Sequence, residues 1–468
     1  MRRTVIVGTF AMCVLLCGPW DAMAVSDAEF DALKRRLDAV EKELSDVKKH
    51  ESDEGGLKTK KDSEPGLSFG STGSGKLIYA KPFVSAPKTT VGGYMDFQYR
   101  TFKNSSIGTG NTLNGVNTNT SSSFDQQRFV PFFYSDITDR LKVAAELEIE
   151  HGVRSKSNSG SGIEVSLEFA TIDYLIKEPL NLRAGIILLP VGKFNLLHDS
   201  PLNELSDRPL VSTLIIPSTL SETGAGFYGT FYPTRLSKLD YEIYVTQGFN
   251  GYDNVGTPVI TSGSSLRDAR QRVSTVDDGL DNNNGKAVVG RIAFSPMLGI
   301  ELGGSGYYGT YDPFSKRPLS IVAFDWTLQR GPFQLIGEAA WAYARDNSKD
   351  LFGNPAADPA FAGQLLPQRM GGYYVQGNYH FMPEFLRRWS PSHFTEASTF
   401  TAVLRWDDIN TNQDVVGGPG DLQRLTVGLN FRPVQDTVFK IDYQFNFENG
   451  KNNRINNDGL VLSVATYF

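Results

Sequence analysis

Cysteine is nearly absent from this sequence, which has two among its 468 residues, Cys13 and Cys17. Both fall in the first 24 residues, which we predict to be removed, so the mature chain holds none. Disulfide bonds, thiolate metal sites and C-x-x-C-H haem attachment are therefore excluded for the mature chain. Leu16 precedes Cys17 where a lipoprotein signal has Gly or Ala, so a lipid anchor is not expected.

The first 24 residues have the three parts of a secretory signal peptide. Residues 2–3 are basic, residues 5–16 are largely apolar, and residues 22–24 form a small-x-small cleavage site, which places the mature start at Val25. The alternative is an uncleaved membrane anchor. It is disfavoured because the apolar run is too short to span a bilayer and ends in Gly18-Pro19.

Long apolar runs are also absent after Val25. No stretch approaches the roughly 20 residues of a membrane helix. Any part that crosses a membrane must therefore be strands closed into a barrel, because lipid cannot satisfy an open sheet edge. The net charge of -6 is mildly acidic and shows no basic footprint for nucleic acid, so no nucleic-acid partner is expected.

Residues 25–50 have the pattern of a short periplasmic coiled coil. Apolar side chains recur in alternating steps of three and four and form a predicted seam at Phe30, Leu33, Leu37, Val40, Leu44 and Val47. A coiled coil with so few heptads associates weakly by itself. Barrels held side by side would raise the effective concentration of the helices enough for the coiled coil to form. We interpret the seam as the mark of an oligomer, with a homotrimer as the leading form. A single amphipathic helix on the barrel mouth is the alternative.

Residues 51–87 are rich in Gly, Ser, Lys and Pro, a composition typical of a flexible linker. From residue 88 to residue 468, strand-like segments alternate with turn-rich breaks. These segments predict an all-β fold, a transmembrane antiparallel barrel. We place sixteen strands, at 89–102, 124–135, 141–151, 163–176, 180–189, 221–232, 239–250, 286–295, 298–311, 319–329, 333–345, 371–381, 399–407, 421–431, 437–447 and 459–468.

Loop length separates a membrane barrel from a soluble sandwich. Apolar and polar side chains alternate within residues 141–150 and 439–448, but a sandwich strand shows the same alternation. The breaks after odd-numbered strands are mostly long, whereas most of those after even-numbered strands are tight. Bacterial outer-membrane barrels have this arrangement, with both termini in the periplasm. The long break at 382–398 departs from the rule and leaves open a missed or added strand pair.

A family resemblance rests on two features of the sequence. One is Leu182-Arg183-Ala184-Gly185 followed by Pro190-Val191-Gly192-Lys193-Phe194-Asn195, and the other is a last strand of alternating apolar residues that ends at Phe468. This last strand is similar to the assembly signal that the barrel-assembly machinery of outer membranes recognises. With the signal peptide, coiled coil and linker, these features resemble the phosphate-selective porin O and P family of outer-membrane porins.

The resemblance implies that the loop after the strand at 180–189 folds inward and narrows the channel. Residues 190–220 correspond in order and length, and they contain Lys193, His198, Asp199, Glu204, Asp207 and Arg208. The loop is also unusually apolar, with Leu196, Leu197, Leu210, Leu214, Ile215 and Ile216. Such a loop must pack against something. The inner wall is one surface available to it, and the interface between subunits is the alternative.

The family name implies phosphate, but the charges expected in the lumen are mixed. A phosphate-selective path needs rows of Arg or Lys, and no continuous basic ladder emerges. Acidic residues cluster on the third and fourth strands and basic ones on the thirteenth to fifteenth, which predicts a field across the pore. An ordinary balanced lumen is the alternative. The pore-lining candidates are Glu146, Glu148, Arg183, Lys193, Asp199, Glu204, Arg208, Arg405, Arg424, Arg432 and Lys440.

Several motifs resemble chemical sites but are better explained by the barrel. Gly224 to Gly229 and Gly304 to Gly309 match G-x-G-x-x-G, yet both lie inside alternating segments, so we interpret them as paired barrel strands. The Asp-rich and Asn-rich run at 277–285 has the density of oxygen ligands that calcium favours but lacks the spacing of an EF-hand and its closing Glu, so an ordinary outer loop is expected and a calcium-binding loop is the alternative. The five histidines show no metal-ligand spacing. We therefore expect no metal, no cofactor and no catalytic site.

The leading functional interpretation is passive diffusion of ions and small hydrophilic solutes, including anions such as phosphate, through a porin in the cell outer membrane. Outer-membrane lipid is then the main partner. A structural barrel that tethers the cell wall through its coiled coil is one alternative, and a sheath for an electron-transfer protein is another. A barrel hydrolase needs Ser and His on one wall, and no such pair can be placed.

Overall fold

The computed structural model describes residues 89–103, 120–151, 164–252, 259–260, 265–270, 285–312, 314–345, 367–415, 420–448 and 457–468. The predicted signal peptide, coiled coil and linker lie outside these residues, as does all but the last residue of the Asp-rich run at 277–285. The interpretations of those segments therefore stay predictions.

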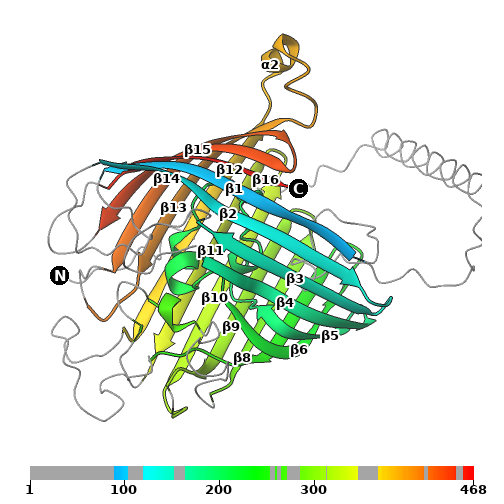
Figure 1. Cartoon of the computed structure of the whole chain (residues 1–468), viewed down its shortest axis with the longest axis vertical. Coiled ribbons are helices and arrows are strands. Elements are labelled where there is room, and N and C mark those ends of the chain that lie inside the picture. Colours follow the sequence, from blue (N-terminus) through cyan, green and yellow to red (C-terminus); the bar gives the residue numbers. More distant parts are fainter. Residues whose placement is uncertain are drawn as a thin grey trace, which may run out of the picture. The chain divides into compact units, whose positions relative to one another are not determined.

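Sixteen antiparallel strands close into one barrel, in which each strand pairs with its sequence neighbours and β1 pairs with β16 (Figure 1). The predicted strand number and the fold class are confirmed. The strands are β1 Thr89–Lys103, β2 Thr120–Asp136, β3 Leu141–Glu150, β4 Glu164–Lys177, β5 Leu180–Leu188, β6 Ser221–Phe231, β7 Lys238–Thr246, β8 Ala287–Met297, β9 Ile300–Thr310, β10 Pro318–Arg330, β11 Phe333–Ala344, β12 Arg369–Phe381, β13 Thr399–Asn410, β14 Asp421–Val434, β15 Thr437–Glu448 and β16 Gly459–Tyr467.

The end of the chain closes the barrel. Tyr467 lies opposite Tyr94 in the β1–β16 ladder, and the backbone of Phe468 exchanges hydrogen bonds of 3.1 and 2.9 Å with that of Gly93. The Phe468 ring stacks on Phe129 of β2, with centroids 5.6 Å apart and planes at 8°. The terminal aromatic is therefore part of the seam that joins the first and last strands.

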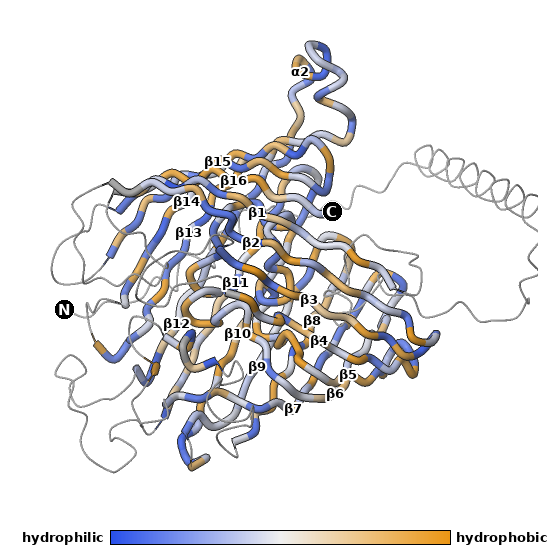
Figure 2. Tube along the Cα trace, viewed as in Figure 1, coloured by the Kyte–Doolittle hydropathy of each residue, from blue (hydrophilic) through white to orange (hydrophobic). Residues whose placement is uncertain are grey.

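The two faces of the wall have opposite polarity. In β15, Phe439 and Ile441 are exposed on the outside, whereas Lys440 and Asp442 are buried inside. Figure 2 shows the same alternation of apolar and polar residues along most strands. An apolar outer surface is compatible with contact to lipid. In a closed barrel each strand has a neighbour on both sides, so the backbone N–H and C=O groups in the membrane are hydrogen-bonded within the protein. The barrel is therefore a membrane-spanning one.

The two rims of the barrel differ in loop length. Residues 178–179, 298–299, 331–332 and 435–436 form two-residue turns at the rim where β1 begins and β16 ends. The connections at the other rim are mostly much longer, as the sequence predicted. The exception at 382–398 conceals no strand pair, because β12 and β13 pair directly from Gly371 and Asn410 to Phe381 and Phe400.

The connection between β12 and β13 carries the short helix α2, Glu384–Trp389, which stands away from the strands in Figure 1. None of the helices in the described residues is long and apolar enough to cross a membrane.

Both glycine motifs lie within strands, the first in β6 and the second in β9. The prediction that these strands pair with each other is wrong, since β6 pairs with β5 and β7, and β9 with β8 and β10. Strands in similar positions of the barrel wall can have similar sequences. Sequence similarity therefore does not show that two strands are neighbours.

Candidate functional site: the charged cavity inside the barrel

The connection between β5 and β6, residues 189–220, enters the lumen, and we call it the inner segment. Its neck is closed by a backbone hydrogen bond of 2.9 Å from Leu189 N to Leu220 O. Asn195 clamps the same neck, because its side-chain amide donates to the carbonyls of Leu189 and Leu220 at 2.8 and 2.9 Å and accepts from Leu220 N at 2.8 Å. The segment also contains two short helical turns, η2 at Phe194–Leu196 and η3 at Val211–Ile215.

Buried carboxylates of the wall hold the inner segment in place. Glu338 on β11 accepts from Phe194 N at 3.0 Å and from the Ser212 hydroxyl at 2.9 Å. Further anchors come from three other strands: Asp96 accepts from the Ser200 hydroxyl at 2.6 Å, Asp407 from Leu210 N at 2.9 Å, and Asp442 from Ser206 N at 2.6 Å. The segment therefore crosses the lumen and is bound to walls that lie apart in the barrel.

Gly192 allows the closest of these contacts. Its φ is +70°, and a Cβ added there would lie 2.5 Å from a Glu338 carboxylate oxygen. A residue with a side chain would therefore be strained and would also clash with the anchor. This gives a physical reason for the glycine in the Pro190-Val191-Gly192 motif.

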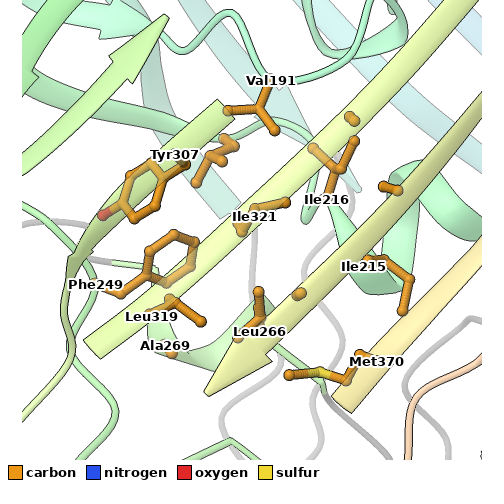
Figure 3. Close-up of a cluster of buried hydrophobic side chains, with 14 of the residues drawn as sticks. Val191, Ile215, Ile216, Phe249, Leu266, Ala269, Tyr307, Leu319, Ile321 and Met370 are labelled. Atoms are coloured by element: carbon orange, nitrogen blue, oxygen red, sulfur yellow. The ribbon is translucent and has the colours of Figure 1, made fainter. Parts of the chain in front are cut away.

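Apolar side chains of the inner segment pack against the barrel wall. Val191, Ile215 and Ile216 share one buried cluster with Leu319 and Ile321 of β10 (Figure 3). Phe249, Leu266 and Ala269 join this cluster from the connection between β7 and β8. These side chains are buried inside the barrel, so they do not cover an interface between subunits, which was the alternative.

This apolar core departs from the wet lumen that alternation predicts. Inward positions of β8 to β12 near the long-loop rim are apolar, among them Val289, Tyr307, Ile321, Ala342 and Met370. They are covered by protein, so that side of the lumen is filled. An open space lies on the other side, beside β1 to β3.

A cavity of about 280 Å³ lies on that side, between the inner segment and the wall. Its wall residues lie at the ends of β1, β2, β3 and β14 that border the long loops. The charged side chains that line it are Arg100, Arg128, Arg208, Arg267, Arg270 and Arg424, together with Asp125, Glu148, Glu150 and Asp207. His151 also lines it. Six arginines against four carboxylates leave a positive excess.

Ion pairs order the two sides of this cavity. Arg128 lies between Glu148 and Glu150, with nitrogen to oxygen distances of 3.1 and 2.9 Å. On the inner segment, Asp207 pairs with Arg100 and lies 3.9 Å from Arg424. Burial alone would raise the pKa of Asp207, but these two guanidinium groups outweigh it and hold that pKa below its ordinary range. Asp207 therefore keeps its charge at any physiological pH.

Three of the predicted pore-lining residues, Glu148, Arg208 and Arg424, line this cavity. The other candidates lie elsewhere inside the barrel, in local contacts. The basic ones contact nearby partners: Lys193 with Glu301 at 3.0 Å, Arg183 with Asp173 at 2.7 Å, Arg405 with Asp407 at 2.9 Å, Arg432 with Glu204 at 3.3 Å and Lys440 with Ser200 O at 2.8 Å. Asp199 accepts from the Tyr467 hydroxyl at 2.9 Å, and Glu146 is buried on β3.

Several titratable residues of the cavity, among them Arg128, His151, Arg267 and Arg270, were not among the pore-lining candidates predicted from the sequence. Arg128 and His151 lie on or beside strands, and the alternation of β2, where Phe129 faces outward, could have shown that Arg128 faces inward. Arg267 and Arg270 belong to the long connection after β7, which has no periodicity to interpret. Arg270 reaches the inner segment, where it donates to Pro217 O and Thr219 O at 3.1 and 3.2 Å.

The segregation of charge expected from the sequence is present on the strands but is partly compensated. Glu148 and Glu150 on β3 face Arg128 on β2, with nitrogen to oxygen distances of 3.1 and 2.9 Å. On the other side, Arg405 is paired with Asp407. Opposite charges beside each arc weaken the field between the arcs, so the predicted transverse field stays a hypothesis.

The fold can be compared with known proteins. OmpF of Salmonella typhi, in a complex with daunomycin, gives a TM-score of 0.50 at 11% identity over 81% of this chain and 97% of that one. The chain is thus similar in fold to OmpF. An anion-selective porin from Comamonas acidovorans gives a TM-score of 0.47 at 10% identity, over 81% of this chain and 99% of its own.

An uncharacterized protein of Aquifex aeolicus (strain VF5) is 27% identical over 367 residues, which are 76% of this chain and 74% of that protein. No family model matches the sequence. The resemblance to the phosphate-selective porins thus has no support beyond the barrel that such porins share with general porins.

His151 makes the charge of the cavity depend on pH. Its Nδ1 lies 2.8 Å from an Asp125 carboxylate oxygen, and this hydrogen bond raises the pKa of His151 above 6.5 against the opposing effect of partial burial. Glu150 raises it further and Arg128 opposes it. Because a raised pKa keeps the proton to higher pH, the extra positive charge is present below that pKa and is lost as pH rises through it.

We therefore expect any preference of the pore for anions to fall as pH rises from about 6 to 9, through the histidine range. Reversal potentials in a salt gradient measure it. His151→Gln should remove this pH dependence, and His393→Gln, which alters a histidine on the connection between β12 and β13, should keep it. An unchanged pH profile in His151→Gln would contradict the assignment.

Proposed function

We propose that this chain is an outer-membrane channel for passive diffusion of ions and small hydrophilic solutes, and that the charged cavity is its narrowest polar passage. The observation that carries the proposal is the inner segment, which is bound across the lumen and leaves a lined cavity on one side. A barrel used only as a tether has no need of a charged, partly open interior. The similarity in fold to OmpF supports the proposal.

The charge of the cavity supports a modest preference for anions. Arginine guanidinium groups can replace part of the hydration shell of an anion, and they outnumber the carboxylates in the cavity. Those carboxylates interrupt the basic surface, so a bound phosphate would also meet Glu148, Glu150 and Asp207. We therefore propose a general porin with a weak anion preference rather than a phosphate-specific one.

We also propose a homotrimer whose termini lie in the periplasm, on the rim of the short turns. The predicted heptad seam supports the oligomer. Thr89 and Phe468 lie at the same rim of the barrel, which supports placing both termini on the same side of the membrane. The long loops would then face the cell exterior, as in other barrels of this kind.

Planar-bilayer recording of the refolded mature chain tests the function. We expect stable conductance steps, closure in three equal substeps at high voltage, and a reversal potential that indicates a weak anion preference in a KCl gradient. Inorganic phosphate should reduce the chloride current only slightly. A folded barrel without conductance would contradict the channel, a single closing step would contradict the trimer, and strong block by phosphate would contradict the absence of phosphate specificity.

A further inference from the structure

We propose that the inner segment and the barrel wall form a binding site for a divalent transition-metal cation. The ligands are Glu146 on β3 and His198 and Asp199 on the inner segment, with Glu168 on β4 beside them. The ligand atoms of the first three lie within 4.8 Å of one another, and all three side chains are buried. The site is separate from the charged cavity, and it does not depend on which solute the channel conducts.

The orientation of His198 supports a ligand role. Its Nδ1 lies 2.9 Å from the carbonyl oxygen of Asn195, which can only accept, so Nδ1 carries a hydrogen. In the neutral ring, Nε2 then presents a lone pair to Glu168, whose two oxygens lie 3.0 and 3.2 Å away. A lone pair facing a carboxylate is repulsive without a cation. Metal-binding histidines are typically held in this way, by a carbonyl oxygen on the other ring nitrogen.

The spacing of these atoms suits a shared metal ion. At metal distances of about 2.1 Å, two ligand atoms lie roughly 3.0 Å apart in an octahedral site and roughly 3.4 Å apart in a tetrahedral one. His198 Nε2 lies 3.0 and 3.2 Å from the two Glu168 oxygens, which is within that range. Glu146 and Asp199 bring further carboxylate oxygens into the same cluster, since the ligand atoms of Glu146, His198 and Asp199 all lie within 4.8 Å of one another.

The surroundings of the cluster supply the outer contacts that a metal site needs. The hydroxyl of Tyr467, on β16, donates to an Asp199 oxygen at 2.9 Å. This hydrogen bond orients the Asp199 carboxylate. The hydroxyl of Tyr94 is fully buried, has no hydrogen-bond partner among the described residues, and lies within the electrostatic reach of Glu168 and Asp199. A water molecule bound to a metal in this cluster would provide that partner.

The donor set defines the class of ion. One imidazole nitrogen with several carboxylate oxygens suits Zn²⁺, Mn²⁺ or Fe²⁺ better than an all-oxygen cation such as Ca²⁺. Because the ligands come from both the wall and the inner segment, a bound ion would pin residues 198–199 to β3 and β4. The metal would thereby stiffen the segment that narrows the lumen.

Sequence spacing could not show this site. The ligands lie on two strands and one loop, and Glu146 and His198 are brought together only by pairing of β3, β4 and β5 and by entry of the inner segment. The expectation of no metal followed from the search for ligands spaced closely along the chain, and the proposed site departs from it because its ligands are distant in the sequence.

Zinc titration of the folded full-length mature chain, stripped with EDTA, tests the proposal. We expect one tight site per chain by calorimetry. Glu146→Gln and His198→Gln should weaken binding by about a hundredfold or more, and Tyr467→Phe, which keeps every ligand, by about 10–100-fold as for other outer-shell changes. His393→Gln, which removes a distant histidine, should bind zinc like the unaltered chain.

Absence of tight binding to the unaltered chain would overturn the proposal and leave His198 as a protonated partner of Glu168. Equal binding by Glu146→Gln and His198→Gln would also overturn it, because zinc would then be bound elsewhere. If those two variants do not fold, the unaltered chain still decides: zinc should raise its unfolding temperature and EDTA should reverse the rise, and no shift would overturn the proposal.

Discussion

Channels that lack residues 190–219 are expected to carry several times the single-channel current of the full-length channel. The inner segment crosses the lumen, and its apolar half fills the side next to β8 to β12. Removal of the inner segment opens the lumen across the full diameter of the barrel. Conductance follows the cross-section of the narrowest part of the channel, so a large increase in current is expected.

The barrel is built to tolerate this deletion. Leu188 already lies opposite Ser221, and Leu189 N donates to Leu220 O at 2.9 Å, so β5 and β6 form a closed hairpin below the inner segment. A two-residue Asn-Gly turn between Leu189 and Leu220 matches the twist of such a hairpin. The cost is water contact for the apolar wall, including Leu319 and Ile321, so the variant should unfold at a lower temperature.

A matched control removes chain from the opposite rim. Deletion of residues 384–395 takes away α2 and its flanking turn, which lie outside the strands, and should leave the conductance unchanged. Single-channel recording at constant salt compares the three proteins, and resistance of the folded barrel to denaturation on gels confirms assembly. If the inner-segment deletion conducts like the full-length chain, the segment does not limit the current.

Replacement of Arg208, Arg267 and Arg270 together by Gln is expected to reverse the weak anion preference. The cavity would then hold three arginines against four carboxylates, instead of six against four. Gln retains a side-chain donor for the carbonyls that Arg208 and Arg270 contact, at Ser218, Pro217 and Thr219, so the inner segment should stay in place. The change in sign should be largest at low ionic strength, where screening is weakest.

The control for charge alone replaces three exposed arginines at the short-turn rim, Arg140, Arg330 and Arg388, by Gln. It removes the same net charge from the chain at a distance from the cavity, and we expect its reversal potential to match that of the unaltered channel. Reversal potentials in a KCl gradient make the comparison. Equal shifts in both triple variants would mean that overall charge, and not the cavity, sets the preference.

The strands were predictable because their signal is local. Period-two polarity and tight turns such as residues 331–332 depend on a few neighbouring residues, so all sixteen strands could be placed from the sequence. Boundaries next to long loops were less accurate: β7 ends at Thr246 rather than at 250, and β2 begins at Thr120 rather than at 124. Near these loops the chain leaves the ladder without a strong turn residue.

The interior was only partly predictable because its contacts are not local. Inward charge on β3, β14 and β15 followed from alternation, and the apolar content of residues 190–220 indicated that they pack against a surface. Arg267 and Arg270 meet Arg208 through loops that share no periodicity. The apolar inner wall of β8 to β12 was also not predicted. Alternation of apolar and polar residues separates the two faces of a strand but does not show what covers each face.

The sequence by itself determined the barrel, its strand number, the polarity of its two faces and the alternation of short turns with long loops. These features follow from backbone hydrogen bonding and from the two-residue repeat of a strand, which neighbouring residues express. Only the tertiary structure decided where the inner segment is bound, which side of the lumen it fills, and which charges line the remaining cavity. Those outcomes depend on entry of the inner segment into the closed barrel, which brings residues distant in the sequence, such as Glu146 and His198 or Arg100 and Asp207, close together.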